Sequence, residues 1–281
     1  DFRLGYGGFG NSGDGGGARV VHLVDAAGQL ARHVHLDGAV AGDLGLILDG
    51  LVAAVARQPG PTAGSGGRDQ WLRGLREQAA ATVERDRALL ESDAEPIHPA
   101  RIYGELRRQL ADDAVVIGDG GDFVSFAGRY LEPARPGGWL DPGPYGCLGT
   151  GLGYALAARL ARPGAQVVLL LGDGAAGFSL MDVDTLVRHR LPVVIVCGNN
   201  GIWGLEKHPM RMLYGYDVAA DLQPGCRYDQ VVRALGGAGE LVRSPAQIGP
   251  ALARAFDAGV PYLVNVATDP EVAYPRSTTG I

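Results

Sequence analysis

The chain has 281 residues, of which 46% are hydrophobic and 20% charged, and its net charge is −6 at neutral pH. This composition is typical of a globular protein, and the negative charge argues against a nucleic-acid-binding surface, which needs clustered cations. Three scattered cysteines predict neither a disulfide framework nor a zinc site, and no apolar run approaches the roughly 18 residues of a membrane span. We therefore expect a cytoplasmic protein.

Residues 1–57 predict part of an α/β domain. Residues 19–25 (RVVHLVD) have the composition of a strand, and residues 44–56 form an apolar-rich helix pattern. One strand and one helix cannot bury both faces of a sheet. We therefore expect this segment to be a domain fragment whose remainder lies upstream of Asp1.

Residues 58–97 predict a linker. Its first part, 58–67 (QPGPTAGSGG), has the composition of a flexible break. A connector helix with a single apolar stripe is expected after it. The stripe consists of Trp71, Leu75, Ala79 and Val83.

Strand and helix patterns alternate through residues 98–281. Strands are expected at 114–117, 166–171, 192–197 and 262–266, and helices at 99–110, 123–130, 153–161, 179–189, 228–235 and 246–258. The strand segments are rich in Val, Ile and Leu without polar alternation, which is typical of strands buried on both faces. The sequence therefore predicts an α/β fold with a doubly wound parallel sheet, which binds its ligands at the carboxyl ends of the strands.

Two polar segments directly follow predicted strands. Gly172-Asp173-Gly174 comes after VVLLL, and Asn199-Asn200 comes after VVIVC. The 24 residues between Gly174 and Asn199 are enough for one crossover helix, so the two strands are expected to be parallel and adjacent. Asp173 and Asn200 would then converge at one edge of the sheet.

The residues of these two segments suit a metal ion and a diphosphate. Carboxylate and amide oxygens are ligands for a hard cation such as Mg²⁺, which completes its shell with phosphates and water. Residues 174–177 (GAAG) are expected to begin a helix, where free N–H groups point at an anion. The sequence therefore predicts a diphosphate held between a helix N-terminus and a metal ion.

A dinucleotide site is the competing interpretation. Residues 172–177 also match GxGxxG after a strand, which would indicate an NAD-dependent oxidoreductase. Such a site needs an acidic residue about 20 positions on to hold the ribose, whereas the next strand ends in two asparagines and no acid follows before Glu206. Asp173 would repel a bare pyrophosphate but becomes useful with a metal between them. We therefore favour the metal–diphosphate interpretation.

The spacing from GDG to NN resembles the thiamine diphosphate signature. Residues 172–209 (GDGAAGFSLMDVDTLVRHRLPVVIVCGNNGIWGLEKHP) resemble the acetolactate synthase-like enzymes and their oxalyl-CoA decarboxylase and 2-hydroxyacyl-CoA lyase relatives. Those enzymes contain a pyrimidine-binding, a central and a diphosphate-binding domain, in that order. The resemblance covers essentially the whole chain. It implies that residues 1–57 are the C-terminal part of the central domain and residues 98–281 the thiamine diphosphate-binding domain.

The resemblance also implies a set of site residues. The side chains of Asp173 and Asn200 and the backbone carbonyl of Ile202 would bind Mg²⁺. Leu148 matches the bulky residue that holds the cofactor bent, with its 4′-imino nitrogen near the reactive C2. The other implied cofactor-binding residues are Gly120, Gly121, Asp122, Gly172, Gly174, Ala175, Ala176, Trp203 and Gly204. Asp122 departs from the family pattern. An acid beside phosphate needs the metal ion or a hydrogen-bond donor nearby, unless its side chain points away.

The implied activity is that of a decarboxylase or carboligase acting on a 2-oxo acid or an acyl-CoA. In the family, the activating glutamate lies on the pyrimidine-binding domain, and no glutamate of this chain matches its motif. We therefore expect an N-terminal half, as upstream sequence or a separate chain, in a homo- or hetero-oligomer such as a dimer or tetramer.

Several questions stay open at this stage. An ungapped alignment places Pro209 where acetolactate synthases have a tryptophan that helps to choose the second substrate, which leaves the reaction undecided. Glu206, Lys207 and His208 follow the metal loop and are candidates for substrate contact. A non-catalytic or regulatory subunit that keeps the metal–diphosphate site is the alternative function. Binding of FAD or ADP by the central domain is also undecided.

Overall fold

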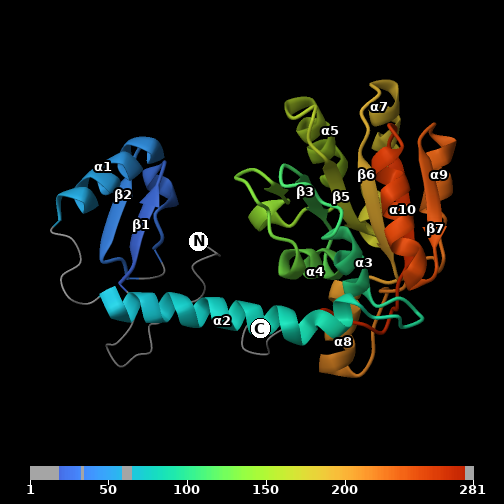
Figure 1. The fold of residues 1–281 in the computed structure, drawn as a ribbon, viewed down its shortest axis with the longest axis horizontal. Coiled ribbons are helices and arrows are strands. Elements are labelled where there is room, and N and C mark those ends of the chain that lie inside the picture. The colour runs from blue at the N-terminus through green and yellow to red at the C-terminus, as the bar shows by residue number, and fades with distance from the viewer. Residues whose placement is uncertain (1–18, 33–34, 59–64, 276–281) are drawn as a thin grey trace. The chain divides into compact units, whose positions relative to one another are not determined.

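The structure is a computed structural model that describes residues 19–32, 35–58 and 65–275. Its contacts divide the chain into two compact units, Asp1–Ala79 and Ala80–Ile281 (Figure 1). Helix α2 (Ser65–Leu90) contributes residues to both units and begins within the segment expected to be a flexible break. Among the described residues, no helix is long and apolar enough to cross a membrane.

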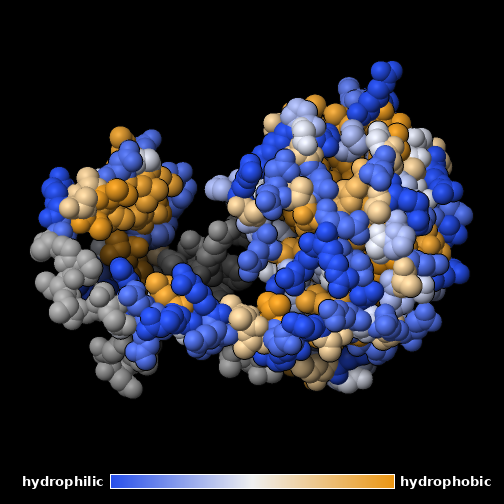
Figure 2. Space-filling view, viewed as in Figure 1, coloured by the Kyte–Doolittle hydropathy of each residue, from blue (hydrophilic) through white to orange (hydrophobic). Residues whose placement is uncertain are grey.

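In its described part the first unit contains two parallel strands, one complete α-helix and the beginning of α2. Strands β1 (Val21–Val24) and β2 (Gly38–Ala41) pair directly, and helix α1 (Leu44–Arg57) follows them. No residue of α1 is buried, and its apolar side chains form an exposed surface (Figure 2). The predicted strand and helix are confirmed, whereas the domain boundaries near residues 57 and 97 stay a prediction.

A six-stranded sheet forms the centre of the second unit. Every pair of neighbouring strands in it is parallel, and the strand order is β4-β3-β5-β6-β8-β7. The strands are β3 (Val115–Asp119), β4 (Trp139–Leu140), β5 (Val167–Gly172), β6 (Val194–Asn199), β7 (Ala238–Val242) and β8 (Tyr262–Ala267). The predicted parallel sheet is confirmed, and β5 and β6 are adjacent, as the crossover argument required.

Side chains of the central strands alternate between two apolar cores, one on each face of the sheet. In β5, Val168 and Leu170 belong to one core, and Leu169 and Leu171 belong to the other. The helices of the first core are α3 (Pro99–Leu106), α4 (Asp122–Tyr130) and α10 (Pro245–Asp257). Those of the second core are α5 (Gly151–Ala161), α6 (Asp173–Ser179), α7 (Val183–Arg188) and α9 (Tyr228–Ala234). The doubly wound arrangement is therefore confirmed (Figure 1).

Several elements differ from the prediction. The helix expected at 179–189 is divided, because α6 is followed by a 3₁₀ turn at Leu180–Asp182 before α7 begins. Helix α8 (Gly204–Tyr214) was not expected; it contains Pro209, which removes a helical hydrogen bond. Edge strands β4 and β7 lack the long apolar runs of buried strands, so neither was predicted.

The order of the strands creates a crevice at one edge of the sheet. From β3 the chain passes to β4 on one side, whereas β5 lies on the other side of β3 and leads on to β6. Where connections diverge in this way, a crevice forms beyond the carboxyl ends of the strands. The loops that follow β3, β5 and β6 all begin at this edge.

Candidate cofactor site

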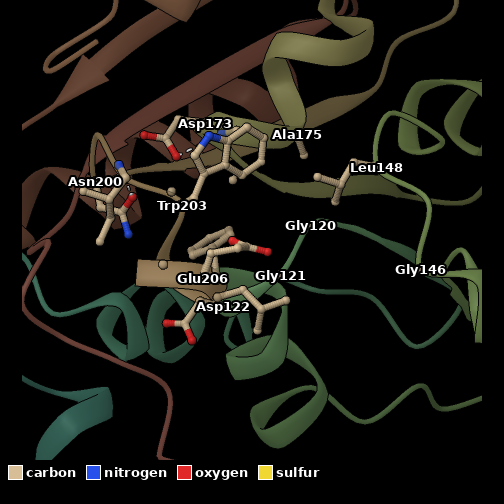
Figure 3. Close-up of a pocket in the computed structure, with 17 residues that line it drawn as sticks. Gly120, Gly121, Asp122, Gly146, Leu148, Asp173, Ala175, Asn200, Trp203 and Glu206 are labelled. Carbon is tan, nitrogen blue, oxygen red and sulfur yellow. Dashed lines mark hydrogen bonds between the residues drawn. The ribbon is translucent and has the colours of Figure 1, made fainter. Parts of the chain in front are cut away.

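A cavity of about 260 Å³ lies at the carboxyl edge of the sheet (Figure 3). It is lined by the loops after β3, β5 and β6 and by the turn before α5. Every predicted site residue lines it except Ala176, which is buried further along α6. The lining predicted residues are Gly120, Gly121, Asp122, Leu148, Gly172, Asp173, Gly174, Ala175, Asn200, Ile202, Trp203 and Gly204. The fold thus brings these distant segments together, and their roles as ligands stay a prediction.

Asp173 connects the loop after β5 to the loop after β6. It is the first residue of α6, and it is 3% exposed. Its Oδ1 accepts a hydrogen bond from the N–H of Gly174 at 3.0 Å, and its Oδ2 accepts one from the N–H of Gly201 at 2.6 Å. Oδ1 of Asn200 accepts the N–H of Ile202 at 3.1 Å. The carboxylate and the amide oxygen therefore both bond to backbone N–H groups of the short segment that contains Asn200.

The environment of Asp173 disfavours its own negative charge. Burial raises its pKa to about 6, although the N–H groups of Gly201 and Gly174 act in the opposite direction. Among the described residues, no Lys, Arg or His side chain lies within ion-pair distance of this carboxylate. A buried carboxylate without a cationic side chain is well suited to a bound cation, which supplies the missing positive charge.

Glycines in the loops of the cavity let neighbouring side chains and ligands approach the backbone closely. A Cβ atom on Gly174 would lie 2.4 Å from Cζ3 of Trp203, so the indole ring packs directly on the GDG turn. The same ring makes an edge contact with Phe178, with 6.2 Å between centroids. Trp203 therefore both lines the cavity and packs against its neighbours. A Cβ on Gly172 would meet no atom within 4 Å, so the space beside this turn is open.

Asp122 is turned away from the centre of the cavity. It is the first residue of α4, and its Oδ2 accepts a hydrogen bond from the N–H of Tyr274 at 3.0 Å. Figure 3 shows its carboxylate directed away from Asp173 and Trp203. The N–H of Tyr274 thus supplies the hydrogen-bond donor that an acid in this loop was expected to need.

Leu148 reaches the cavity from the turn before α5. Its side chain points toward Ala175 (Figure 3) and is partly packed against the apolar core of that face. An apolar side chain in this place can contact a ring system but cannot exchange protons. Its chemistry is therefore that of a steric support.

Sequence reasoning missed some of the lining residues. Phe123, Gly146, Gly198 and Leu205 line the cavity without having been predicted. Leu205 belongs to the first turn of α8, so recognition of that helix would have placed it at the site. Glu206, which was a candidate for substrate contact, also lines the cavity, and its carboxylate extends toward the cavity in Figure 3.

Lys207 and His208 do not line the cavity. Lys207 is buried and forms an ion pair with Asp221, while Asp217 Oδ1 lies 4.0 Å from its Nζ. Its charge is therefore engaged by these two carboxylates on the segment that follows α8. Of the three residues considered after the metal loop, only Glu206 is placed for substrate contact.

The chemistry of the donor set fits a divalent cation with a diphosphate. Asp173, Asn200 and the carbonyl of Ile202 offer a carboxylate, an amide and a backbone oxygen, which are the donors that Mg²⁺ takes. The open space at Gly172 borders the first turn of α6, where backbone N–H groups favour an anion.

Comparison with known proteins gives the family. Residues 119–266 match the model of the thiamine pyrophosphate enzyme C-terminal TPP-binding domain. The chain is 54% identical over 279 residues to the acetolactate synthase large subunit IlvG of Mycobacterium tuberculosis, covering 98% of this chain and 48% of that protein. It is 44% identical over 154 residues to the 2-hydroxyacyl-CoA lyase 2 of Xenopus laevis, covering 54% of this chain and 24% of that protein.

A solved structure of a thiamine diphosphate-dependent enzyme has a similar fold. The thiamine diphosphate-dependent 4-hydroxybenzoylformate decarboxylase of Rhodococcus jostii RHA1 superposes with a TM-score of 0.69 at 25% identity. The superposition covers 90% of this chain and 44% of that one. The chain thus spans about half the length of the acetolactate synthase large subunit and of the decarboxylase. It belongs to the thiamine pyrophosphate enzymes and contains their C-terminal cofactor-binding domain.

Proposed function

We propose that this chain supplies the diphosphate-binding half of the active site of a thiamine diphosphate- and Mg²⁺-dependent carbon–carbon lyase or ligase. The observation that carries the proposal is the buried Asp173 carboxylate, which is bonded to Gly201 beside Asn200 and has no cationic partner among the described residues. A metal ligand has its counter-charge supplied by the ion.

In this proposal each part of the cavity has a separate task. Asp173, Asn200 and the Ile202 carbonyl would hold Mg²⁺, and the first turn of α6 at Gly174 and Ala175 would hold the diphosphate. Bound thiamine diphosphate would supply a nucleophilic carbon for addition to a substrate carbonyl. Leu148 would support the bent shape of the cofactor, and the apolar walls would exclude water from its rings.

The substrate class and the partner are also proposed. The names of the relatives support a 2-oxo acid or an acyl-CoA as substrate, since they are an acetolactate synthase, a 2-hydroxyacyl-CoA lyase and a decarboxylase. We propose that a pyrimidine-binding domain, on upstream sequence or on another chain, completes the site within an oligomer. Glu206 would face the substrate, because it lines the cavity without an ion pair in the described part of the chain.

Thermal unfolding with different ligands tests the proposal. Thiamine diphosphate with Mg²⁺ should stabilise the chain by about 2.7 kcal/mol at 100 times its Kd, and EDTA should remove the effect. NAD⁺ should give no shift. Stabilisation by NAD⁺ but not by thiamine diphosphate would show that the dinucleotide interpretation was correct. Mixing the chain with a pyrimidine-binding domain then separates an enzyme from a non-catalytic subunit, because only the enzyme consumes a 2-oxo acid or an acyl-CoA.

A further inference from the structure

Asp119 connects the end of β3 to the turn that carries Leu148. It is the last residue of β3, and its side chain is fully buried, with 0% exposure. Its Oδ1 accepts the N–H of Gly149 at 2.9 Å, and its Oδ2 accepts the N–H of Gly151 at 2.7 Å. The two oxygens therefore bind backbone groups on either side of Thr150. These contacts span about 30 residues of sequence.

The turn is also confined from its other side. Gly149 has φ +85°, and a Cβ there would lie 2.7 Å from Cβ of Phe178. A Cβ on Gly151 would lie 2.5 Å from Cδ1 of Leu169. The chain is thus held between the end of β3, the central strand β5 and the helix that follows β5. Leu148, which directly precedes Gly149 and lines the cavity, has its backbone position set by these contacts.

The charge of Asp119 is matched to the start of α5. Helix α5 begins at Gly151, and its N-cap residue Thr150 makes no side-chain capping bond. Asp119, at the end of β3, instead accepts a hydrogen bond from the first N–H of the helix. The helix dipole also favours a negative charge at this end of the helix. Burial raises the pKa of Asp119, and the N–H groups of Gly151 and Gly149 act against this rise.

We propose that Asp119 is a positioning residue that fixes Leu148 against the rings of thiamine diphosphate and so controls recognition of the thiamine part rather than of the diphosphate. This inference rests on the proposed function. The bonds of Asp119 hold the Leu148 side of the cavity, whereas Asp173 and Asn200 lie on the other two loops. Replacement by Asn keeps the shape but places an NH₂ group against a backbone N–H, so one of the two hydrogen bonds is lost.

The test compares two ligands on the full 281-residue chain. Calorimetric titration would measure the Kd of thiamine diphosphate and of inorganic pyrophosphate, each with Mg²⁺. Asp119→Asn should raise the Kd of thiamine diphosphate by about tenfold and the Kd of pyrophosphate by less than about twofold. Leu148→Ala should show the same selectivity, because it removes the side chain that Asp119 positions.

A buried acid outside the cavity provides the control. Asp86 is 4% exposed and is bonded to Arg129, and neither residue lines the cavity. Asp86→Asn should therefore leave the ratio of the two dissociation constants unchanged, even where it lowers the melting temperature. An Asp119→Asn chain that loses both ligands equally, or neither, would overturn the inference. Failure of the unaltered chain to bind thiamine diphosphate is a different result, because it contradicts the proposed function itself and removes the basis of the inference.

A second variant decides the matter if Asp119→Asn does not fold. Gly149→Ala leaves Asp119 intact but forces a side chain into a left-handed conformation and against Phe178. The contact is with Cβ of Phe178, which is fixed to the backbone of α6, so the turn that carries Leu148 must shift instead. The same selective loss of thiamine diphosphate affinity is expected. A normal ratio of the two affinities in Gly149→Ala would overturn the inference.

Discussion

The Asp173 carboxylate and the backbone N–H of Gly201 are joined by a hydrogen bond with 2.6 Å between Oδ2 and N. This bond connects the loop after β5 to the loop after β6, which are the two loops on which the proposed metal site depends. It leaves Asn200, the residue before Gly201, beside the same carboxylate.

Removal of the Asp173 charge should strongly weaken metal-dependent cofactor binding. Asp173→Asn keeps the size of the side chain but removes the only negative charge among the three proposed ligands. We expect the Kd for thiamine diphosphate with Mg²⁺ to rise by roughly 100-fold, or about 2.7 kcal/mol. Calorimetric titration of both chains checks this. An Asp173→Asn chain that binds with normal affinity would contradict the proposed metal site.

Without metal, Asp173 should make the stability of the chain depend on pH. Its pKa is 3.8 in the unfolded state and about 6 in the folded state, so the folded chain binds the proton more tightly. This contribution is fully present below pH 3.8 and is lost as pH rises through 6. The difference in unfolding free energy between the unaltered chain and Asp173→Asn should fall by about 3 kcal/mol across this range. Urea unfolding in EDTA at several pH values measures it, and a difference independent of pH would contradict the shift.

Gly174 should not tolerate a side chain, whereas Gly177 in the same helix should. A Cβ on Gly174 would lie 2.4 Å from the Trp203 ring, but one on Gly177 would meet no atom within 4 Å. Gly174→Ala should therefore displace Trp203 and weaken thiamine diphosphate binding by about tenfold. Gly177→Ala should keep the affinity and stabilise the helix by up to about 1 kcal/mol. Titration calorimetry and melting curves compare the two, and equal affinities would show that the packing of Trp203 on Gly174 does not matter.

The buried ion pair of Asp86 should contribute much more to stability than an exposed pair. Asp86 is 4% exposed and accepts hydrogen bonds from Arg129 Nε at 2.6 Å and from the hydroxyl of Tyr130 at 3.3 Å. Burial alone raises its pKa, but the hydrogen bonds and charges of Arg129 and Arg85 hold the pKa below its usual value. Asp86→Ala should cost about 3 kcal/mol in unfolding free energy, because it leaves Arg129 without its partner.

An exposed pair in the same unit provides the comparison. Asp184 and Arg188 form an ion pair with side chains that are 52% and 59% exposed. Asp184→Ala should cost less than about 0.5 kcal/mol because water screens such pairs. Urea unfolding compares the variants. Equal losses would mean that burial of Asp86 contributes nothing to the strength of its pair.

The sequence contained enough information to place the loops of the cavity but not all of its walls. Apolar runs mark β5 and β6, and polar residues directly after them mark the edge where Asp173 and Asn200 meet. Glu206 was a candidate from its place shortly after Asn200, whereas Leu205 was missed because helix α8 was not predicted. The contact of Asp119 with Gly149 and Gly151 joins segments about 30 residues apart, and no local pattern of residues predicts such a contact.

The main-chain character of the cavity wall restricts which positions can change without loss of the cofactor. A Cβ would lie 2.4 Å from Trp203 at Gly174, 2.4 Å from Phe123 at Gly198 and 2.9 Å from Leu205 at Gly121. Replacement of any of these glycines by a residue with a side chain would narrow the cavity, although no proposed ligand of the metal ion would be changed. Glu206, in the first turn of α8, lines the cavity and is not among the side chains that these glycines contact. New substrate preferences would therefore arise most readily on α8, while the glycine loops retain the cofactor.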